Sequence, residues 1–397
     1  MRLWRRHKAS LEPLPDPAAG GSRDWTGCLS TPCRGELRQA ITSLDLGRLQ
    51  KYPPPKPSGL PVGHELRILR RFVTGRCSLL DPSGFSAAYR LLASERERAL
   101  YRAFVLGEPL GLSSWQDLIG AKRVEVWIAN GLLGGAGGLL GCGFRVIPVG
   151  GAVMAADPLN VLFPGRVHIG LDSLNLIEFL AGRRLPAGGR YLDAGTGAGA
   201  ILLQLSHAYD EAIGIDINPR AVEVAAFNDE LSSDAKARVY HEDVFALGGE
   251  YGRFEFITWN VPFMFFPESY REGAVDGYGG DMGIELTTRF IEEALPGLMA
   301  DGGACCLLSS APILVSGRNL LEERLAGPAA SLDLDIKVFV RRSFRVKELQ
   351  EFHRAHGIAR FESVFLEIRK GGGGLRRVGA PAADRAVDAL RRALLYR

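Results

Sequence analysis

The sequence predicts an α/β protein in which a doubly wound, mostly parallel sheet of seven strands follows a small helical domain. Three observations support this prediction. The 397 residues exceed what one ordinary core accommodates. From Tyr191 onward, short apolar runs alternate with helical segments, which is typical of a parallel sheet. Residues 61–156 instead show helical patterns followed by two short extended runs.

Composition and charge indicate a folded chain whose basic residues gather at its ends. Hydrophobic residues make up 46% and charged residues 23%, which argues against wholesale disorder. The overall net charge is +3, but residues 1–60 and 370–397 each carry +5, and residues 61–369 carry −7. An acidic body disfavours a long track of phosphate contacts, so nucleic acid stays an open but not favoured partner.

The sequence gives no sign of a metal site or a membrane segment. The six cysteines form no Cys-x-x-Cys pair, so we expect no metal. The most apolar stretch, Gly131 to Phe144, falls short of the ~18 residues that a spanning helix needs. Prolines interrupt the segment after the basic start, unlike a signal peptide. We therefore expect a cytoplasmic protein without a membrane partner.

Two regions are expected before the sheet. Residues 1–60 contain many prolines and are expected to form a flexible leader with one short helix from Glu36 to Leu49. Residues 61–156 show three helical patterns and a β-hairpin, which is typical of a winged-helix-like accessory domain. Its helices should begin at Ser94, at a cap on Ser113 or Ser114, and at Ala121, and its hairpin should follow Phe144. The third helix has few basic residues, so we expect dimerisation or docking rather than DNA binding.

Residues 157–370 carry the strand–helix alternation, and residues 371–397 are expected to form a Gly linker and a basic tail. The alternation predicts crossover helices from Ala198 to His207, from Pro219 to Leu231 and from Leu286 to Leu298. The seven strands are expected at 190–193, 212–216, 237–241, 254–259, 304–309, 334–340 and 363–368.

The strongest motif is Tyr191-Leu-Asp-Ala-Gly-Thr-Gly-Ala-Gly199, in which a strand turns through glycines into a helix. Gly195 and Gly197 allow a close approach of a ligand to the backbone. This turn also fits dinucleotide enzymes, in which it faces a pyrophosphate. Asp193 favours a cationic cofactor over a dinucleotide, because a carboxylate there would repel pyrophosphate but stabilise a positive charge. S-adenosylmethionine, with its sulfonium and ammonium groups, fits this requirement.

Two further acids follow the next two strands. Asp216 ends the second strand 23 residues after Asp193, where a carboxylate can accept both hydroxyls of a ribose. Asp243 follows the third strand, where an acid can accept from an adenine amino group. A turn-forming role is the alternative for Asp243.

The fourth strand ends in Trp259-Asn260-Val-Pro-Phe263. With this motif, residues 167–370 resemble class I S-adenosylmethionine-dependent methyltransferases, which have a Rossmann-like sheet. They most resemble the HemK-like glutamine methyltransferases of release factors and the base N-methyltransferases, which carry Asn-Pro-Pro-Tyr/Phe at this place. Similar blocks follow a winged-helix-like domain in bacterial proteins. The resemblance implies that Asp193, Gly195, Thr196, Gly197, Asp216, Asp243 and Asn260 bind the cofactor.

The resemblance also implies the catalytic roles. Asn260 and the carbonyl of Val261 would accept hydrogen bonds from a planar NH₂ group, and Phe263 would stack on the acceptor. The nitrogen of a glutamine amide or of a nucleobase would then face the sulfonium methyl. Val261 replaces the first proline of the family motif, which removes a rigid turn. A hydroxyl, carboxylate or amine of a specialised metabolite or peptide is therefore an alternative acceptor.

Four other residues are candidates for the acceptor site. Tyr270 and Arg271 lie beside the Gly-rich stretch from Gly273 to Gly283, which either covers the acceptor or is an ordinary flexible loop. His168 and Ser173 precede the first strand of the sheet and either line the acceptor pocket or begin a helix. A regulator of the winged-helix type with a vestigial cofactor site is the alternative from another functional class.

Overall fold

The computed structural model describes residues 25–29, 33–51, 94–150, 152–157, 165–181, 183–232, 236–269, 277–346 and 349–378. Contacts between residues divide the chain into two units. The first unit comprises Met1–Leu174, Gly197–Ala200 and Arg220–Ala235, and the second comprises Asn175–Thr196, Ile201–Pro219 and Lys236–Arg397.

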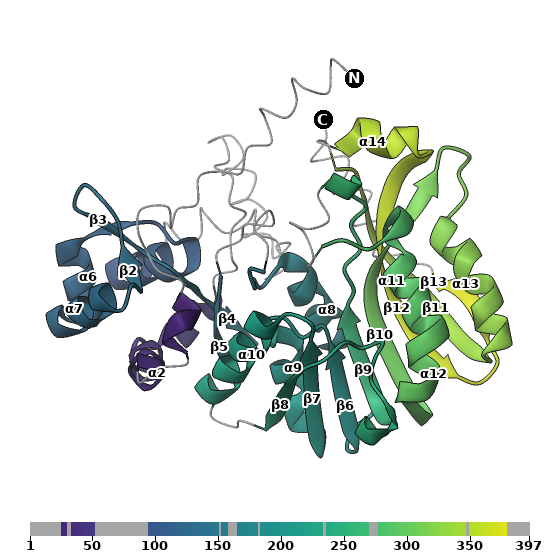
Figure 1. Cartoon of the computed structure of the whole chain (residues 1–397), viewed down its shortest axis with the longest axis horizontal. Coiled ribbons are helices and arrows are strands. Elements are labelled where there is room, and N and C mark those ends of the chain that lie inside the picture. The colour runs from purple at the N-terminus through teal and green to yellow at the C-terminus, as the bar shows by residue number, and fades with distance from the viewer. Residues whose placement is uncertain are drawn as a thin grey trace. The chain divides into compact units, whose positions relative to one another are not determined.

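The second unit is built on an eight-stranded sheet with the strand order β13-β11-β12-β10-β9-β6-β7-β8 (Figure 1). Five strand pairs are parallel, and the pairs β10–β12 and β11–β12 are antiparallel. The prediction of an α/β protein with a mostly parallel sheet is confirmed. The strands are β6 (Arg190–Ala194), β7 (Glu211–Asp216), β8 (Ala237–His241), β9 (Phe254–Asn260), β10 (Met299–Leu314), β11 (Leu334–Phe344), β12 (Ile358–Lys370) and β13 (Gly374–Val378).

The structure has an eighth strand, β13, where the sequence predicted seven strands. This strand lies within residues 371–397, which were expected to form a linker and a tail. It pairs in parallel with β11, where Ile336 lies opposite Leu375. Gly371 and Gly374 adopt positive φ angles of 98° and 64°, which turn the chain back to the sheet edge. The backbone N–H of Gly372 donates to Asp333 Oδ1 at 2.8 Å and fixes this turn. The remaining tail, residues 379–397, lies outside the described residues.

Both faces of the sheet are packed with apolar side chains, because alternate residues of a strand point to opposite faces. One face packs Ile257 and Leu307 against α11 (Glu285–Arg289), α12 (Leu295–Leu298) and α13 (Leu320–Ser331). A π-helical segment, Phe290–Ala294, joins α11 to α12, so the predicted helix from Leu286 to Leu298 is present with an altered middle. The other face packs Tyr191 and Phe256 against Leu180 of α8 (Leu171–Ala181) and Leu202 of α9 (Ala200–Leu205).

The first unit combines short helices with two small antiparallel sheets, β1-β3-β2 and β4-β5. Ser94 caps its helix through a capping box with Glu97, as predicted for a helix start. Gly111 precedes α6 without a side-chain cap, so the predicted cap at Ser113 or Ser114 is wrong. The elements are α2 (Cys33–Ser43), α5 (Glu95–Leu100), a π-helical turn (Tyr101–Leu106), β1 (Leu110–Gly111), α6 (Leu112–Ile119), α7 (Ala121–Ala129), β2 (Leu133–Gly134), β3 (Leu139–Cys142), β4 (Arg145–Val149), β5 (Ala152–Ala156) and α10 (Pro219–Leu231), whose first residue belongs to the second unit.

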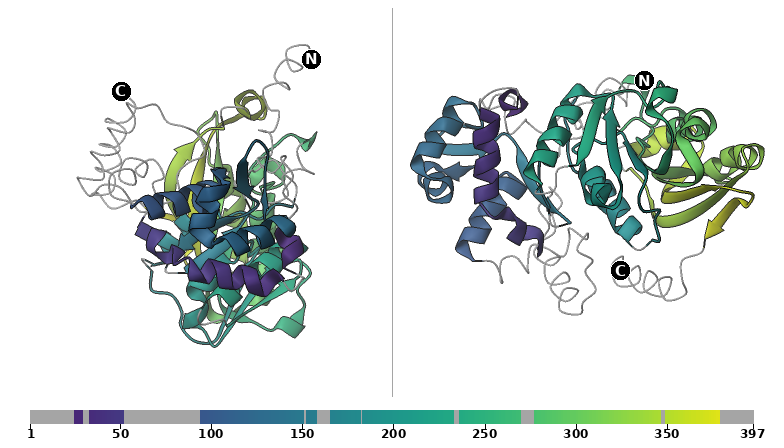
Figure 2. Two further views of the ribbon diagram at one scale, coloured as in Figure 1. Left: turned by 90° about the vertical axis from the view of Figure 1, so that its left-hand side faces the viewer. Right: turned by 90° about the horizontal axis from the view of Figure 1, so that it is seen from below.

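Part of the expected leader is folded into the first unit. Leu37 and Ile41 form a buried stripe on α2, and Trp25 is fully buried. Figure 2 shows α2, in purple, beside the blue helices of this unit in both views. Glu36 of α2 accepts a hydrogen bond from Trp127 Nε1 of α7 at 3.0 Å. The winged-helix-like identity of this unit stays a prediction.

A buried carboxylate, Asp157, joins distant segments of the first unit. It accepts two hydrogen bonds from Arg220 at 2.6 and 2.8 Å, and one each from Trp25 Nε1 at 2.8 Å and the Val167 N–H at 2.7 Å. Burial alone would raise the pKa of Asp157, but the hydrogen bonds and the charge of Arg220 hold that pKa below its usual value.

We expect Asp157→Ala to lower the free energy of unfolding by about 3–5 kcal/mol, because it removes the carboxylate that pairs with the Arg220 guanidinium, whose side chain is only 14% exposed. The midpoint of urea unfolding at pH 7 measures this loss. Glu230→Ala is the matched control, since its pair with Arg34 is partly exposed and contributes about 0–1 kcal/mol.

Equal losses in the two variants would contradict a central role for Asp157. Because its pKa is lowered on folding, its ionisation should stabilise the protein above the unfolded pKa. This contribution should disappear as the pH falls below about 4.

Candidate active site

The turn after β6 has the geometry expected of a ligand-binding glycine turn. Gly195 and Gly197 adopt left-handed φ angles of 57° and 56°. A Cβ on Gly195 would lie 2.6 Å from Trp259 Nε1, so this position excludes any side chain. The N–H of Thr196 donates to the carbonyl of Ile215 at 2.9 Å, which fixes the turn against the end of β7.

Asp193 lies directly before this turn and is fully buried. Its carboxylate accepts hydrogen bonds from Thr258 Oγ1 at 2.7 Å and from Thr196 Oγ1 at 2.8 Å. Burial raises the pKa of Asp193 to about 7, although these hydrogen bonds oppose the rise. The free protein therefore holds Asp193 near its titration point at neutral pH.

Thr258 is a site residue that the sequence analysis missed. Its hydroxyl proton goes to Asp193, so the Tyr191 hydroxyl, 2.6 Å away, must donate to Thr258. The parallel register of β6 and β9 places Thr258 opposite Asp193. A buried hydroxyl within an apolar strand was the available signal, but its partner depended on this register.

Asp216 and Asp243 follow neighbouring parallel strands, so the structure brings them to the same sheet edge as Asp193. Asp216 is half-buried and accepts the N–H of Asn218 at 2.9 Å. Asp243 is exposed and accepts the N–H of Phe245 at 3.0 Å, which is a turn-forming contact. The roles of both acids toward a cofactor stay predictions.

Asn260 ends β9, and the chain then enters the Val261-Pro-Phe263 segment. The Val261 N–H donates to the carbonyl of Leu308 at 3.1 Å, a bond that a proline could not make. Ser310 Oγ donates to the carbonyl of Phe263 at 3.0 Å. These bonds hold the segment against β10, so the replacement of the family proline does not leave it unsupported.

The described part of the Gly-rich stretch, residues 277–283, packs on this segment. Met264 forms two backbone hydrogen bonds with it, to the Gly277 carbonyl at 2.7 Å and from the Gly279 N–H at 2.9 Å. A Cβ on Gly279 would lie 2.7 Å from Phe263 Cα. These contacts join residues 277–283 to the Phe263–Met264 segment, and the choice between a loop that covers the acceptor and an ordinary flexible loop stays a prediction. Tyr270 and Arg271 lie outside the described residues.

The structure does not test the other two acceptor candidates. His168 precedes α8 and Ser173 lies in its first turn, and both belong to the first unit. Their assignment to the acceptor site stays a prediction. Within the described ranges, the side chains form no group of three or more metal ligands, and no helix is long and apolar enough to cross a membrane.

Asn228 of α10 is a second residue that the sequence analysis missed. Its Oδ1 accepts the N–H of Ala155 at 2.7 Å, and its Nδ2 donates to the carbonyls of Ala155 and Ala198, each at 2.8 Å. Ala198 follows the glycine turn, so this fully buried amide links β5 to the start of α9. A polar residue beside the buried Val224 and Phe227 was the only signal in the sequence.

We next compared the sequence and the fold with those of known proteins. A family described as a methyltransferase domain matches residues 192–277. These residues include the glycine turn, Asp216, Asp243 and the Asn260 segment. No curated protein matches the sequence.

Solved structures show weak similarity. Trm5b from Pyrococcus abyssi is 14% identical with a TM-score of 0.40, and the match covers 58% of each chain. TYW2 from P. horikoshii is 15% identical with a TM-score of 0.37, over 57% of this chain and 71% of that one. Magnesium protoporphyrin IX methyltransferase from Synechocystis is 17% identical with a TM-score of 0.32, over 50% and 78%. The match thus spans less than two thirds of Trm5b. The substrates of these proteins do not identify the substrate of this chain. Residues 192–277 therefore match a methyltransferase domain, in agreement with the S-adenosylmethionine cofactor that the turn after β6 predicts.

Proposed function

We propose that this protein transfers the methyl group of S-adenosylmethionine to a planar nitrogen, either a glutamine amide or a nucleobase. The observation that supports this most is the position of Asn260. It ends β9, the strand beside β6, and the braced Val261–Phe263 segment follows it. An amide at this edge lies one strand from the glycine turn.

The residues present fit the cofactor. The left-handed Gly197 leaves the backbone open to a ligand, because nothing lies within 4 Å of a Cβ placed there. The half-buried Asp216 offers a carboxylate to ribose hydroxyls. Asp193 supplies negative charge beside the turn, which favours the sulfonium and ammonium groups. Thr196 and Asp243 would complete the site. When bound, the cofactor supplies an activated methyl group.

The protein's own task is then to orient the acceptor. The side-chain oxygen of Asn260 and the carbonyl of Val261 accept hydrogen bonds from a planar NH₂ group. This holds the nitrogen lone pair toward the methyl, while Phe263 packs on the flat acceptor. Positioning contributes most to such a displacement. The attacking nitrogen can lose its proton after transfer, so no strong base is needed.

Methyl-labelled S-adenosylmethionine in a fractionated cell extract tests the proposal. We expect label in a protein or nucleic-acid fraction, at a rate that Asn260→Ala lowers by about 10–1,000-fold because positioning is lost. Cofactor affinity, measured by calorimetry, should change much less than the rate. Label confined to small molecules would instead support the metabolite or peptide acceptor, and binding without any turnover would support a regulator.

Asp216→Ala should weaken cofactor binding by about 1–3 kcal/mol, because ribose hydroxyls lose their acceptor in a partly desolvated site. Isothermal titration measures this loss. Asp210→Ala is a suitable control, since it removes a carboxylate of the same unit from the opposite end of β7. An unchanged affinity in Asp216→Ala would remove this residue from the site.

Binding of S-adenosylmethionine should strengthen as the pH rises through about 7, because ionised Asp193 favours the cationic ligand and the protonated acid does not. We expect the affinity to fall about 10-fold between pH 8 and pH 6. The Asp193→Asn variant should bind S-adenosylmethionine weakly at both pH values, without this change in affinity.

Thermal unfolding of Asp193→Asn in the absence of cofactor separates lost binding from misfolding. Its Tm should stay close to that of the wild type, since the removal of a buried charge offsets the loss of one acceptor oxygen for the hydroxyls of Thr196 and Thr258. A pH step that persists in Asp193→Asn would assign the titration to another group.

A further inference from the structure

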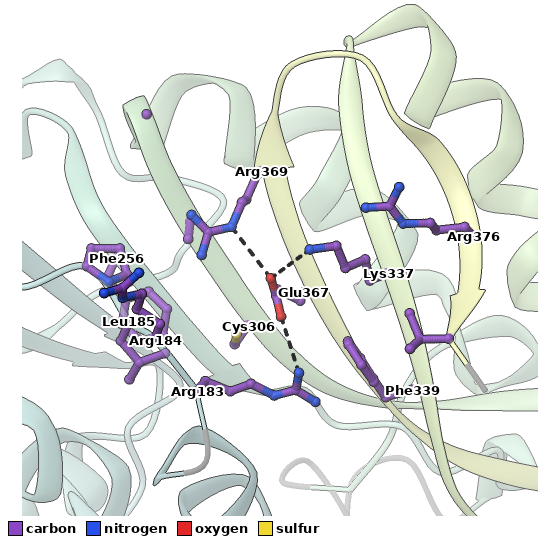
Figure 3. Close-up of a pocket in the computed structure, with 14 residues that line it drawn as sticks. Arg183, Arg184, Leu185, Phe256, Cys306, Lys337, Phe339, Glu367, Arg369 and Arg376 are labelled. Atoms are coloured by element: carbon purple, nitrogen blue, oxygen red, sulfur yellow. Dashed lines mark hydrogen bonds and ion pairs between the residues drawn. The ribbon is translucent and has the colours of Figure 1, made fainter. Parts of the chain in front are cut away.

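A second concave site lies in the second unit (Figure 3). It is a cavity of about 780 Å³ on the sheet face that also carries α8. Phe256, near the start of β9, lines it, whereas Asn260 ends that strand. Four residues of strand correspond to about 13 Å, so the cavity lies beyond the methyl-transfer motifs.

Positive charge dominates the wall of this cavity. Glu367 lies at its centre, where Lys337 at 3.2 Å, Arg369 at 3.5 Å and Arg183 at 3.8 Å surround one carboxylate (Figure 3). The five cations come from the segment after α8 and from three strands, so they converge only in the folded chain. They are Arg183, Arg184, Lys337, Arg369 and Arg376.

These cations exceed the acids that neutralise them. Glu367 and Asp335 are largely buried, with side chains 13% and 14% exposed, and Asp335 pairs with Arg376 at 2.9 Å. The side chains of Arg369 and Arg376 remain 39% and 53% exposed despite these pairs. A concave surface with a surplus of one charge concentrates ions of the opposite charge.

The cavity is also preorganised and partly apolar. The guanidinium of Arg183 lies 4.1 Å from the ring centroids of both Phe179 and Phe339, which fixes its plane. Leu185 and Phe339 offer apolar surface beside the cations. Guanidinium groups bind phosphate oxygens in a two-pronged manner, and the apolar surface suits a flat organic group.

The cysteine at the base of the cavity is not suited to react as a nucleophile. Cys306 lines it, and burial together with the nearby Glu367 raises the pKa of its thiol to about 12. The thiol is therefore neutral at physiological pH and a poor nucleophile.

We propose that this cavity binds a small organic polyphosphate of the size of a nucleoside di- or triphosphate. Its volume suits one such molecule. A long polyanion is disfavoured, because residues 61–369 carry a net charge of −7 and would repel phosphates beyond the cavity.

Calorimetry with ATP and the full-length protein tests this site, with saturating S-adenosylhomocysteine present to block the donor site. Arg184→Glu should weaken ATP binding about 10-fold or more by reversing an exposed charge in the cavity. Glu367→Gln should strengthen it about 3–10-fold, because three cations lose their carboxylate partner. Two variants with opposite expected effects separate this site from general loss of structure.

Arg354→Glu is the matched control, since Arg354 is exposed on α14 (Gln350–Ala355) and outside the cavity. It makes the same change in net charge and should leave ATP affinity unchanged. The proposal is overturned if ATP does not bind at millimolar concentration, or if the control weakens binding as much as Arg184→Glu. Binding of a single-stranded RNA but not of ATP, with the same sensitivity to Arg184→Glu, would also overturn it in favour of a nucleic-acid surface.

Discussion

The candidate site depends on one buried carboxylate and the hydroxyls that hold it. Asp193 accepts hydrogen bonds from Thr196 and Thr258, and these two bonds fix the turn and the register of β6 with β9. The same constraint reaches β7, because a Cβ on Gly214 would lie 3.0 Å from Thr196 Oγ1. A side chain at Gly214, outside the motif, would therefore press on Thr196 as well as on Leu202, whose Cδ2 would lie 2.6 Å from it.

Hydrogen bonds replace proline rigidity in the segment after β9. The bond from the Val261 N–H to Leu308 extends the contact of β9 with β10 by one residue, and the contacts of residues 277–279 hold the far side. A backbone constrained in this way would present Asn260 to the proposed acceptor without the entropy cost of ordering the loop for each substrate. Val261 thus provides a backbone hydrogen bond at the position where the family motif has the rigidity of a proline.

Local patterns in the sequence predicted many of the helices and strands from residue 190 onward. The strand–helix alternation placed α10 and β8 at the observed residues, because apolar periodicity and the proline at position 219 are local signals. Long-range pairing was not accessible in the same way. The roles of Thr258 and Asn228, and the addition of β13 to the sheet edge, depend on partners that lie far away in the sequence. The buried stripe of α2 was visible only as a short helix, since its partner Trp127 lies about 90 residues later.

The free energy of ionising Asp193 in its buried position links the fold to the chemistry of the site. Raising its pKa from 3.8 to about 7 means that ionising it in the free protein costs on the order of 4 kcal/mol. A cationic ligand beside the turn recovers part of that cost, whereas a neutral or anionic ligand recovers none. The hydroxyls of Thr196 and Thr258 keep the cost below that of an unsolvated charge, so the fold tolerates the ionised form. The same burial that makes Asp193 a liability for stability would therefore make the turn selective for a positively charged cofactor in the function that we propose.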